Sequence, residues 1–100
     1  MNIDFANLQL QYQKYKVDID ASIQAVLNKS NYIMGEEVYE LERALEGFTG
    51  AKHAITCSSG TDALLLSMMA IDIQPNDEII TTPFTFIATA ETIALMKAKP

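Results

Sequence analysis

The second half of the chain alternates short β-prone runs with apolar helical segments. "HAITC" (53–57) and "EIITT" (78–82) are short apolar runs, and "GTDALLLSMMAI" (60–71) and "ATAETIALMKA" (88–98) have helical composition. Strands without polar alternation, joined by apolar helices, are typical of a parallel sheet covered on both faces. The sequence therefore predicts an α/β fold. Such a sheet needs more than two strands, so we expect the chain to be an incomplete part of a larger α/β protein.

The first half of the chain predicts two amphipathic helices and an irregular arm. Apolar residues between Asp18 and Lys29 fall at helical spacing, and those after the acidic pair Glu36 and Glu37 do the same, up to the glycines at 47 and 50. "SNYIMG" (30–35) is expected to be the connecting loop, in which Gly35 is a candidate for a positive φ. Residues 2–15 have no clear period, and we leave them irregular. No repeat or linker divides residues 1–100 into domains.

Composition excludes several classes of function. The 100 residues are 49% hydrophobic and carry a net charge of -6, which argues for a globular domain and against a nucleic-acid partner. The single Cys57 and the single His53 provide neither a disulfide nor a metal site. The N-terminus does not resemble a secretory signal, and no apolar run is long enough to span a membrane. We expect a cytoplasmic protein with no metal.

Small polar residues precede the apolar run in "TCSSGTDALLLSMMA" (56–70), and two explanations are open. Ser59 followed three residues later by Asp62 matches a capping box, which is a common structural pattern. Alternatively, the turn binds phosphate, because a helix N-terminus presents free N–H groups and Gly60 allows close approach. Ser58, Ser59 and Thr61 would then add hydroxyl donors. Asp62 opposes such a site unless its carboxylate is otherwise engaged, and both explanations can hold together.

Two aromatic rings follow the second β-prone run in "TTPFTFIATA" (81–90). Phe84 and Phe86 project to the same side of an extended segment, and core packing is one explanation for them. The other is a ring platform, because ligands of open parallel sheets bind outside the carboxyl ends of the strands. An anion site beside an aromatic platform suits a phosphorylated planar cofactor.

The ordered motifs "YIMG", "CSSGTDALLL" and "DEIITTPFTFIATA" resemble the opening of the DegT/DnrJ/StrS family of pyridoxal-phosphate sugar aminotransferases. The resemblance extends into "IDFANLQLQY" and covers nearly all of the chain, but only the N-terminal portion of a typical member. It implies the start of the large, cofactor-binding domain of a fold type I transferase, a three-layer αβα structure with a mainly parallel sheet. The rest of that domain and a small C-terminal domain would lie beyond residue 100. Asn76, where many members have glycine, is a small departure.

The resemblance also implies site residues. Gly60 and Thr61, with Ser59 adjacent, would hold the phosphate of pyridoxal 5'-phosphate, and Phe86 would stack on its ring. Tyr32, Met34 and Gly35 are weaker candidates for lining the nucleotide-sugar or partner-subunit side, and a tight turn explains them equally well. The lysine that forms the Schiff base is expected beyond Pro100. The lysines at 52, 97 and 99 do not match its motif, so the chain supplies no catalytic residue and should be inactive alone.

The implied activity of the parent enzyme is transfer of an amino group, usually from glutamate, to a keto group of a nucleotide-linked sugar. A homodimer is implied, because active sites in the family are shared between two subunits. Two alternatives remain: another fold type I enzyme, such as a sulfur-amino-acid lyase, or a non-enzymatic fragment that docks on a full-length partner. A thiol enzyme based on Cys57 is disfavoured, because no activating base accompanies it.

Overall fold

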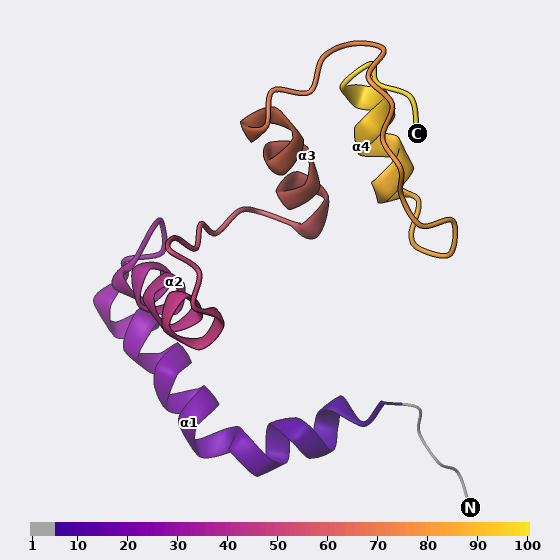
Figure 1. Ribbon diagram of the computed structural model, residues 1–100. Coiled ribbons are helices and arrows are strands. Elements are labelled where there is room, and N and C mark those ends of the chain that lie inside the picture. Colours follow the sequence, from indigo (N-terminus) through magenta and orange to yellow (C-terminus); the bar gives the residue numbers. More distant parts are fainter. Residues whose placement is uncertain (1–5) are drawn as a thin grey trace, which may run out of the picture. The chain divides into compact units, whose positions relative to one another are not determined.

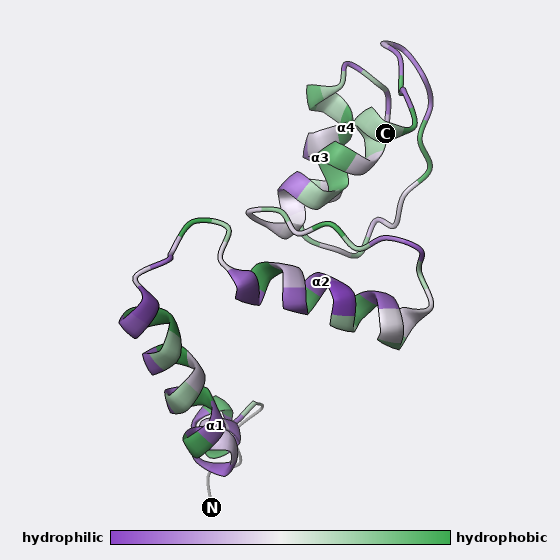
Figure 2. Cartoon of the chain, turned by 90° about the vertical axis from the view of Figure 1, so that its left-hand side faces the viewer, coloured by the Kyte–Doolittle hydropathy of each residue, from purple (hydrophilic) through white to green (hydrophobic). Residues whose placement is uncertain are grey.

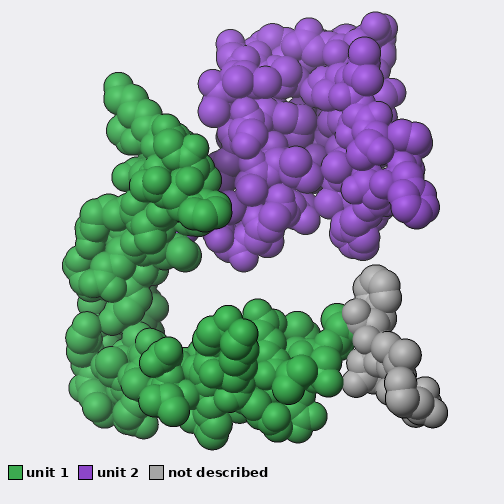
Figure 3. All heavy atoms as spheres, turned by 60° about the horizontal axis from the view of Figure 1, so that its bottom comes forward, with its two compact units in different colours: residues 1–54 green, residues 55–100 purple. Residues whose placement is uncertain are grey.

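The computed structural model describes residues 6–100, which contain four α-helices (Figure 1). They are α1 (Leu8–Lys29), α2 (Glu36–Thr49), α3 (Gly60–Ala70) and α4 (Ala88–Leu95). The chain divides into two compact units, residues 1–54 with α1 and α2, and residues 55–100 with α3 and α4 (Figure 3). No helix in the described part of the chain has the length and apolar character needed to cross a membrane.

Helix α1 begins much earlier than the sequence predicts. The expectation that residues 2–15 are irregular is wrong from Leu8 onward, and residues 1–5 lie outside the described part. The side chain of Asn7 caps the helix, because its Oδ1 accepts a hydrogen bond from the Leu10 N–H at 2.8 Å. No residue of α1 is buried within this structure. Its first turns were not predicted, because the apolar residues between positions 2 and 15 follow no clear helical period.

The loop between α1 and α2 contains Gly35 for a steric reason. Gly35 has a φ of -65°, so the predicted positive φ is wrong at this residue. Positive φ values occur instead at Ser30 (52°) and Met34 (50°). A Cβ on Gly35 would lie 2.9 Å from the Asn31 carbonyl oxygen and 2.8 Å from Glu37 Oε2. Only glycine leaves room for this approach of the main chain.

Ion pairs and hydrogen bonds between side chains link α1 to α2 and connect successive turns of α1. Lys29 Nζ at the end of α1 lies 3.0 Å from Glu37 Oε1 in the first turn of α2. Within α1, the Asp20 carboxylate accepts hydrogen bonds from the Lys16 ammonium and the Tyr12 hydroxyl. These two bonds, that from Lys16 first, hold the pKa of Asp20 below its ordinary value. Figure 2 shows such polar residues spread along α1 and α2, as expected for exposed helices.

The second unit has parallel strand connectivity but no sheet. Glu78 forms an isolated parallel bridge with Lys99, in which the Ile79 N–H donates to the Lys99 carbonyl at 2.9 Å and the Lys99 N–H donates to the Asp77 carbonyl at 2.8 Å. Helix α4 connects the two bridged segments. The sequence instead predicts a strand–helix–strand unit in which the helix at 60–71 joins 53–57 to 78–82, and neither of these segments forms a strand in the described part of the chain. A strand is defined by a ladder to a neighbour, and a single bridge does not make one.

The core of unit 2 is small and centres on α4. Ala88, Ile93 and Ala98 are its buried apolar residues, and Thr92 is 1% exposed. The Thr92 hydroxyl donates to the Ala88 carbonyl at 2.8 Å, so this buried polar group is satisfied. Helix α3 contacts α4, yet Leu64, Leu66 and Met69 of α3 remain partly exposed. Unit 2 therefore does not bury all the apolar side chains of α3.

Candidate functional site

The turn before α3 is a formed helix cap. Ser59 is the N-cap residue in an extended conformation, and its Oγ accepts a hydrogen bond from the Asp62 N–H at 3.1 Å. The Ser59 carbonyl accepts the first helical bond, from the Ala63 N–H at 3.0 Å. This confirms the capping role predicted for Ser59, because one of the orphan donors of the first turn is satisfied by its side chain.

The carboxylate of Asp62 is engaged by Ser58. The Ser58 hydroxyl donates a hydrogen bond to Asp62 Oδ2, across the start of the helix. In a capping box the acid would instead reach back to the N–H of the N-cap residue. The sequence allows an anion site in this turn only if the Asp62 carboxylate is otherwise engaged. The hydrogen bond from Ser58 meets that condition.

Two main-chain donors stay available at the start of α3. Among the described residues, the N–H groups of Gly60 and Thr61 donate to no other group. Gly60 is exposed, and a Cβ built on it would meet nothing within 4 Å. The positive end of the helix dipole lies at the same position. Two free N–H groups, an open approach and nearby hydroxyls form a donor set that can bind a phosphate or carboxylate.

The turn before α4 presents the aromatic rings. Phe84 is 98% exposed and Phe86 is 75% exposed, so neither ring packs into the core of unit 2. The main chain at Phe86 is fixed, because its carbonyl accepts hydrogen bonds from the Thr89 hydroxyl at 3.1 Å and the Thr89 N–H at 3.4 Å. A cavity of about 240 Å³ adjoins Phe86 and is lined by residues 81–83 and 85–87 together with Thr89 and Ala90.

The two turns lie at the same end of unit 2. Figure 1 shows α3 and α4 both beginning at this end, with the segment 78–82 running back toward it beside α4. The side chains of Leu64 in α3, Thr81 in the connecting segment and Ile93 in α4 line one small cavity, so the three elements converge. A turn rich in N–H donors and a turn that carries exposed rings therefore share one edge of the unit, as parallel strand connectivity predicts.

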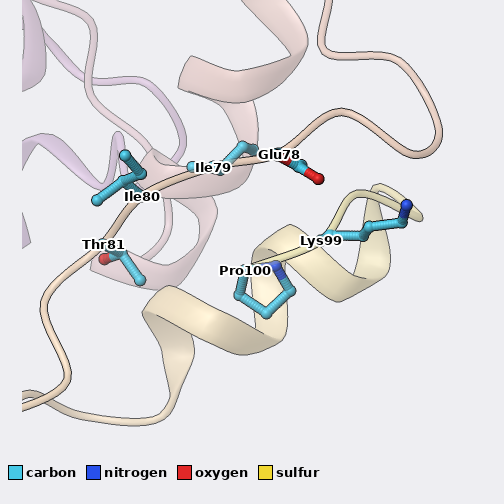
Figure 4. Close-up of a pocket in the computed structure, with 6 residues that line it drawn as sticks. All are labelled: Glu78, Ile79, Ile80, Thr81, Lys99 and Pro100. Carbon is cyan, nitrogen blue, oxygen red and sulfur yellow. The ribbon is translucent and has the colours of Figure 1, made fainter.

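Another cavity lies along the bridged segment. It has a volume of about 490 Å³ and is lined by Glu78, Ile79, Ile80, Thr81, Lys99 and Pro100 (Figure 4). Its lining is mainly aliphatic, and Ile80 is fully exposed. None of the residues predicted for the cofactor site line this cavity. It lies beside residues 78–81, whose main chain forms one parallel bridge, between Glu78 and Lys99.

Three weaker candidates, Tyr32, Met34 and Gly35, belong to the loop of unit 1, and their proposed role stays a prediction. Cys57 is exposed, and its Sγ donates to the Ser59 carbonyl at 3.3 Å. No cluster of potential metal ligands occurs among residues 6–100.

Sequence reasoning missed two contacts that shape the site. The sequence predicts Ser58 only as a hydroxyl donor to an anion, whereas its proton is directed to Asp62. The sequence assigns no role to Thr89, which fixes the main chain at Phe86. The available signals were the spacing of four between Ser58 and Asp62 and of three between Phe86 and Thr89, which bring side chains together at the start of a helix.

Comparison with known proteins gives one consistent result. The model of the DegT/DnrJ/EryC1/StrS aminotransferase family matches residues 13–100. A UDP-2-acetamido-2-deoxy-3-oxo-D-glucuronate aminotransferase of Pseudomonas aeruginosa is 52% identical over 98 residues, which cover 98% of this chain and 27% of that protein.

Two solved structures are also similar. A crystal structure of a DegT DnrJ EryC1 StrS aminotransferase from Brucella abortus has a TM-score of 0.93 and 37% identity, covering 99% of this chain and 26% of that one. The structure of S. venezuelae DesV in complex with a ketimine intermediate has a TM-score of 0.91 and 31% identity, covering 98% and 26%. The chain thus spans about a quarter of the length of these relatives.

Proposed function

Because the chain belongs to the DegT/DnrJ/EryC1/StrS aminotransferase family, we propose that it is the N-terminal part of a pyridoxal-phosphate-dependent sugar aminotransferase. The complete enzyme would move an amino group from glutamate to a keto group of a nucleotide-linked sugar. The name of the P. aeruginosa relative, which acts on a UDP-linked 3-oxo sugar, supports this substrate class. The chain alone would be inactive.

The proposed fold of the complete domain is a three-layer αβα structure with a mainly parallel sheet. Residues 53–57 and 78–82 would become strands when neighbouring strands pair with them. The parallel bridge between Glu78 and Lys99 supports this proposal, and so does the aliphatic cavity of about 490 Å³ beside the same segment. Residues 1–100 would then be the opening of one large domain, which would bury apolar side chains of α3 that unit 2 leaves exposed.

The donor set at the start of α3 fits the phosphate of the proposed cofactor. The N–H groups of Gly60 and Thr61 are free, and the open space over Gly60 allows a phosphate oxygen to reach them. The Thr61 hydroxyl is a third donor. Ser59 uses its oxygen as an acceptor for the Asp62 N–H, so its own hydroxyl proton remains for the phosphate. Capping and anion binding are therefore compatible at Ser59.

Phe86 is proposed to hold the flat ring of the cofactor. Its side chain is exposed at the edge where both helices begin, and Thr89 fixes its main chain. Offset stacking on an aromatic ring contributes about 0.5–1.5 kcal/mol beyond area burial. The two turns would therefore have different roles. The turn at Gly60 would bind the phosphate, and the turn at Phe86 would orient the ring of the cofactor.

The lysine that would carry the covalent bond is proposed to lie outside these 100 residues. Lys97 and Lys99 follow the end of α4, whereas Phe86 precedes its start, so the helix separates them from the proposed ring site. When bound, the cofactor supplies an electron sink at the carbon that carries the amino group. The residues of this chain would bind and orient it. We further propose a cytoplasmic homodimer that uses no metal, nucleic acid or membrane.

One observation carries this proposal: two unused N–H groups and an exposed aromatic ring share one end of unit 2 in a member of this family. The test uses a polypeptide that contains this chain at the full length of its relatives. With pyridoxal 5'-phosphate, glutamate and a UDP-linked 3-oxo sugar, we expect formation of 2-oxoglutarate and an amino sugar. Failure to bind the cofactor, or transfer to no nucleotide-linked keto sugar, would refute the proposal.

A further inference from the structure

We propose that Ser58 is a positioning residue that prevents Asp62 from blocking the anion site. The hydroxyl of Ser58 holds the Asp62 carboxylate, which accepts no hydrogen bond from the free N–H groups of Gly60 and Thr61. The inference rests on the proposed function, because it concerns the anion that Gly60 and Thr61 would bind.

The position of Asp62 makes it a natural competitor for this site. Asp62 is the third residue of α3, and an acid at this position can reach back to the N–H of the N-cap residue, Ser59. That N–H lies one residue before the two donors that a phosphate would need, at Gly60 and Thr61. A carboxylate that turned toward the helix start would therefore repel a dianion through its charge.

The observed hydrogen bond removes this competition. Asp62 Oδ2 accepts from the Ser58 hydroxyl, and the N–H groups of Gly60 and Thr61 remain without an acceptor among the described residues. Ser59, in contrast, satisfies the N–H of Asp62 itself, which lies beyond the two free donors. The two adjacent serines therefore have different tasks: Ser59 caps the helix, and Ser58 restrains the acid.

This assignment changes the role expected of Ser58. A hydroxyl group has one proton, and that proton is directed to Asp62. Ser58 is accordingly not a phosphate ligand. Ser58 would affect the Kd of the cofactor only by restraining the charged side chain of Asp62. A double-mutant cycle tests this, because replacing Ser58 should change the Kd only while Asp62 is present.

The test compares Ser58→Ala, Asp62→Asn and the double variant in the full-length polypeptide. We measure the Kd of pyridoxal 5'-phosphate for the apoprotein by absorbance titration, and that of inorganic phosphate by competition. Ser58→Ala should raise both Kd values roughly three- to tenfold, as expected for a released charge near a helix N-terminus. Asp62→Asn should not weaken binding. In the Asp62→Asn background, Ser58→Ala should have no further effect.

Two controls separate positioning from a structural role. Ser67→Ala removes a comparable hydroxyl from α3, one that donates to the Ala63 carbonyl at 2.7 Å, and should leave both Kd values unchanged. Raising the ionic strength should reduce the effect of Ser58→Ala, because salt screens an exposed charge. A purely structural effect would lower the Tm of the apoprotein without depending on Asp62.

The proposal is overturned if Ser58→Ala leaves the Kd unchanged, or if it raises the Kd equally in both backgrounds. Gly60→Val tests the underlying site separately, since a branched side chain there would obstruct the anion directly. If Gly60→Val weakens binding and Ser58→Ala does not, the inference on Ser58 fails alone. If Gly60→Val also leaves the Kd unchanged, the anion site itself is refuted.

Discussion

Replacing Gly60 by alanine should change stability and cofactor affinity in opposite directions. The backbone of Gly60 does not have a positive φ; among the described glycines only Gly50 does, at 74°. A Cβ at Gly60 would meet nothing within 4 Å. Alanine therefore fits the chain without strain, and the substitution removes only the open space above the two free N–H groups.

The two effects have different magnitudes. Glycine inside a helix costs about 0.5–1 kcal/mol relative to alanine, and the gain at the first helical residue should be at the low end. A hydrogen bond to a charged group contributes about 1.5–3 kcal/mol. If the methyl group displaces the phosphate from one N–H, the Kd of pyridoxal 5'-phosphate rises roughly tenfold to a hundredfold. The Tm of the apoprotein should be unchanged or slightly higher.

The assay combines calorimetry of the apoprotein with an absorbance titration of the cofactor, both on the full-length polypeptide. Gly47→Ala is the matched control, because Gly47 lies in α2 and a Cβ there also meets nothing within 4 Å. It should raise stability and leave the Kd unchanged. A Gly60→Ala variant with a Kd within about twofold of the wild type would show that no anion approaches Gly60.

Three further predictions use related measurements. Thr61→Ala keeps the N–H and loses one hydroxyl, so the Kd of the cofactor should rise roughly tenfold to a hundredfold, and no change would exclude the hydroxyl as a donor. Phe86→Ala should raise the Kd of the cofactor by at least about twofold to tenfold and leave that of inorganic phosphate unchanged; an equal rise for both ligands would contradict stacking. Lys16→Met should raise the pKa of Asp20 more than Tyr12→Phe does, by carbon-13 NMR of the carboxyl group, and the reverse order would contradict the contacts. Because this pKa is lowered, the stabilisation is present above the ordinary pKa of aspartate and is lost as the pH falls through the lowered value.

Local features of the chain were predictable where neighbouring residues decide them. The Ser59 half of the predicted capping box is present, because the Ser59 side chain accepts from the Asp62 N–H three positions away. The other half is wrong, because the Asp62 carboxylate accepts from the Ser58 hydroxyl. The start of α1 was missed because the residues after its cap, Asn7, have a mixed apolar pattern, so periodicity provided no signal. The requirement for Gly35 was misjudged, because the crowding against Asn31 and Glu37 arises only when the loop is folded.

The motifs themselves indicated the family, which the match over residues 13–100 confirms, whereas the cofactor residues Ser59, Gly60, Thr61 and Phe86 stay predictions. By itself, the sequence determined where helices α2 to α4 lie, how α3 is capped, and that its first turn carries small polar residues. These features follow from interactions within one helical turn. Tertiary structure decided that the turns at Gly60 and Phe86 share one end of unit 2, and that Glu78 pairs with Lys99 in parallel. Such contacts join residues distant in the sequence, so they depend on how α3, α4 and the connecting segment pack together rather than on any local pattern.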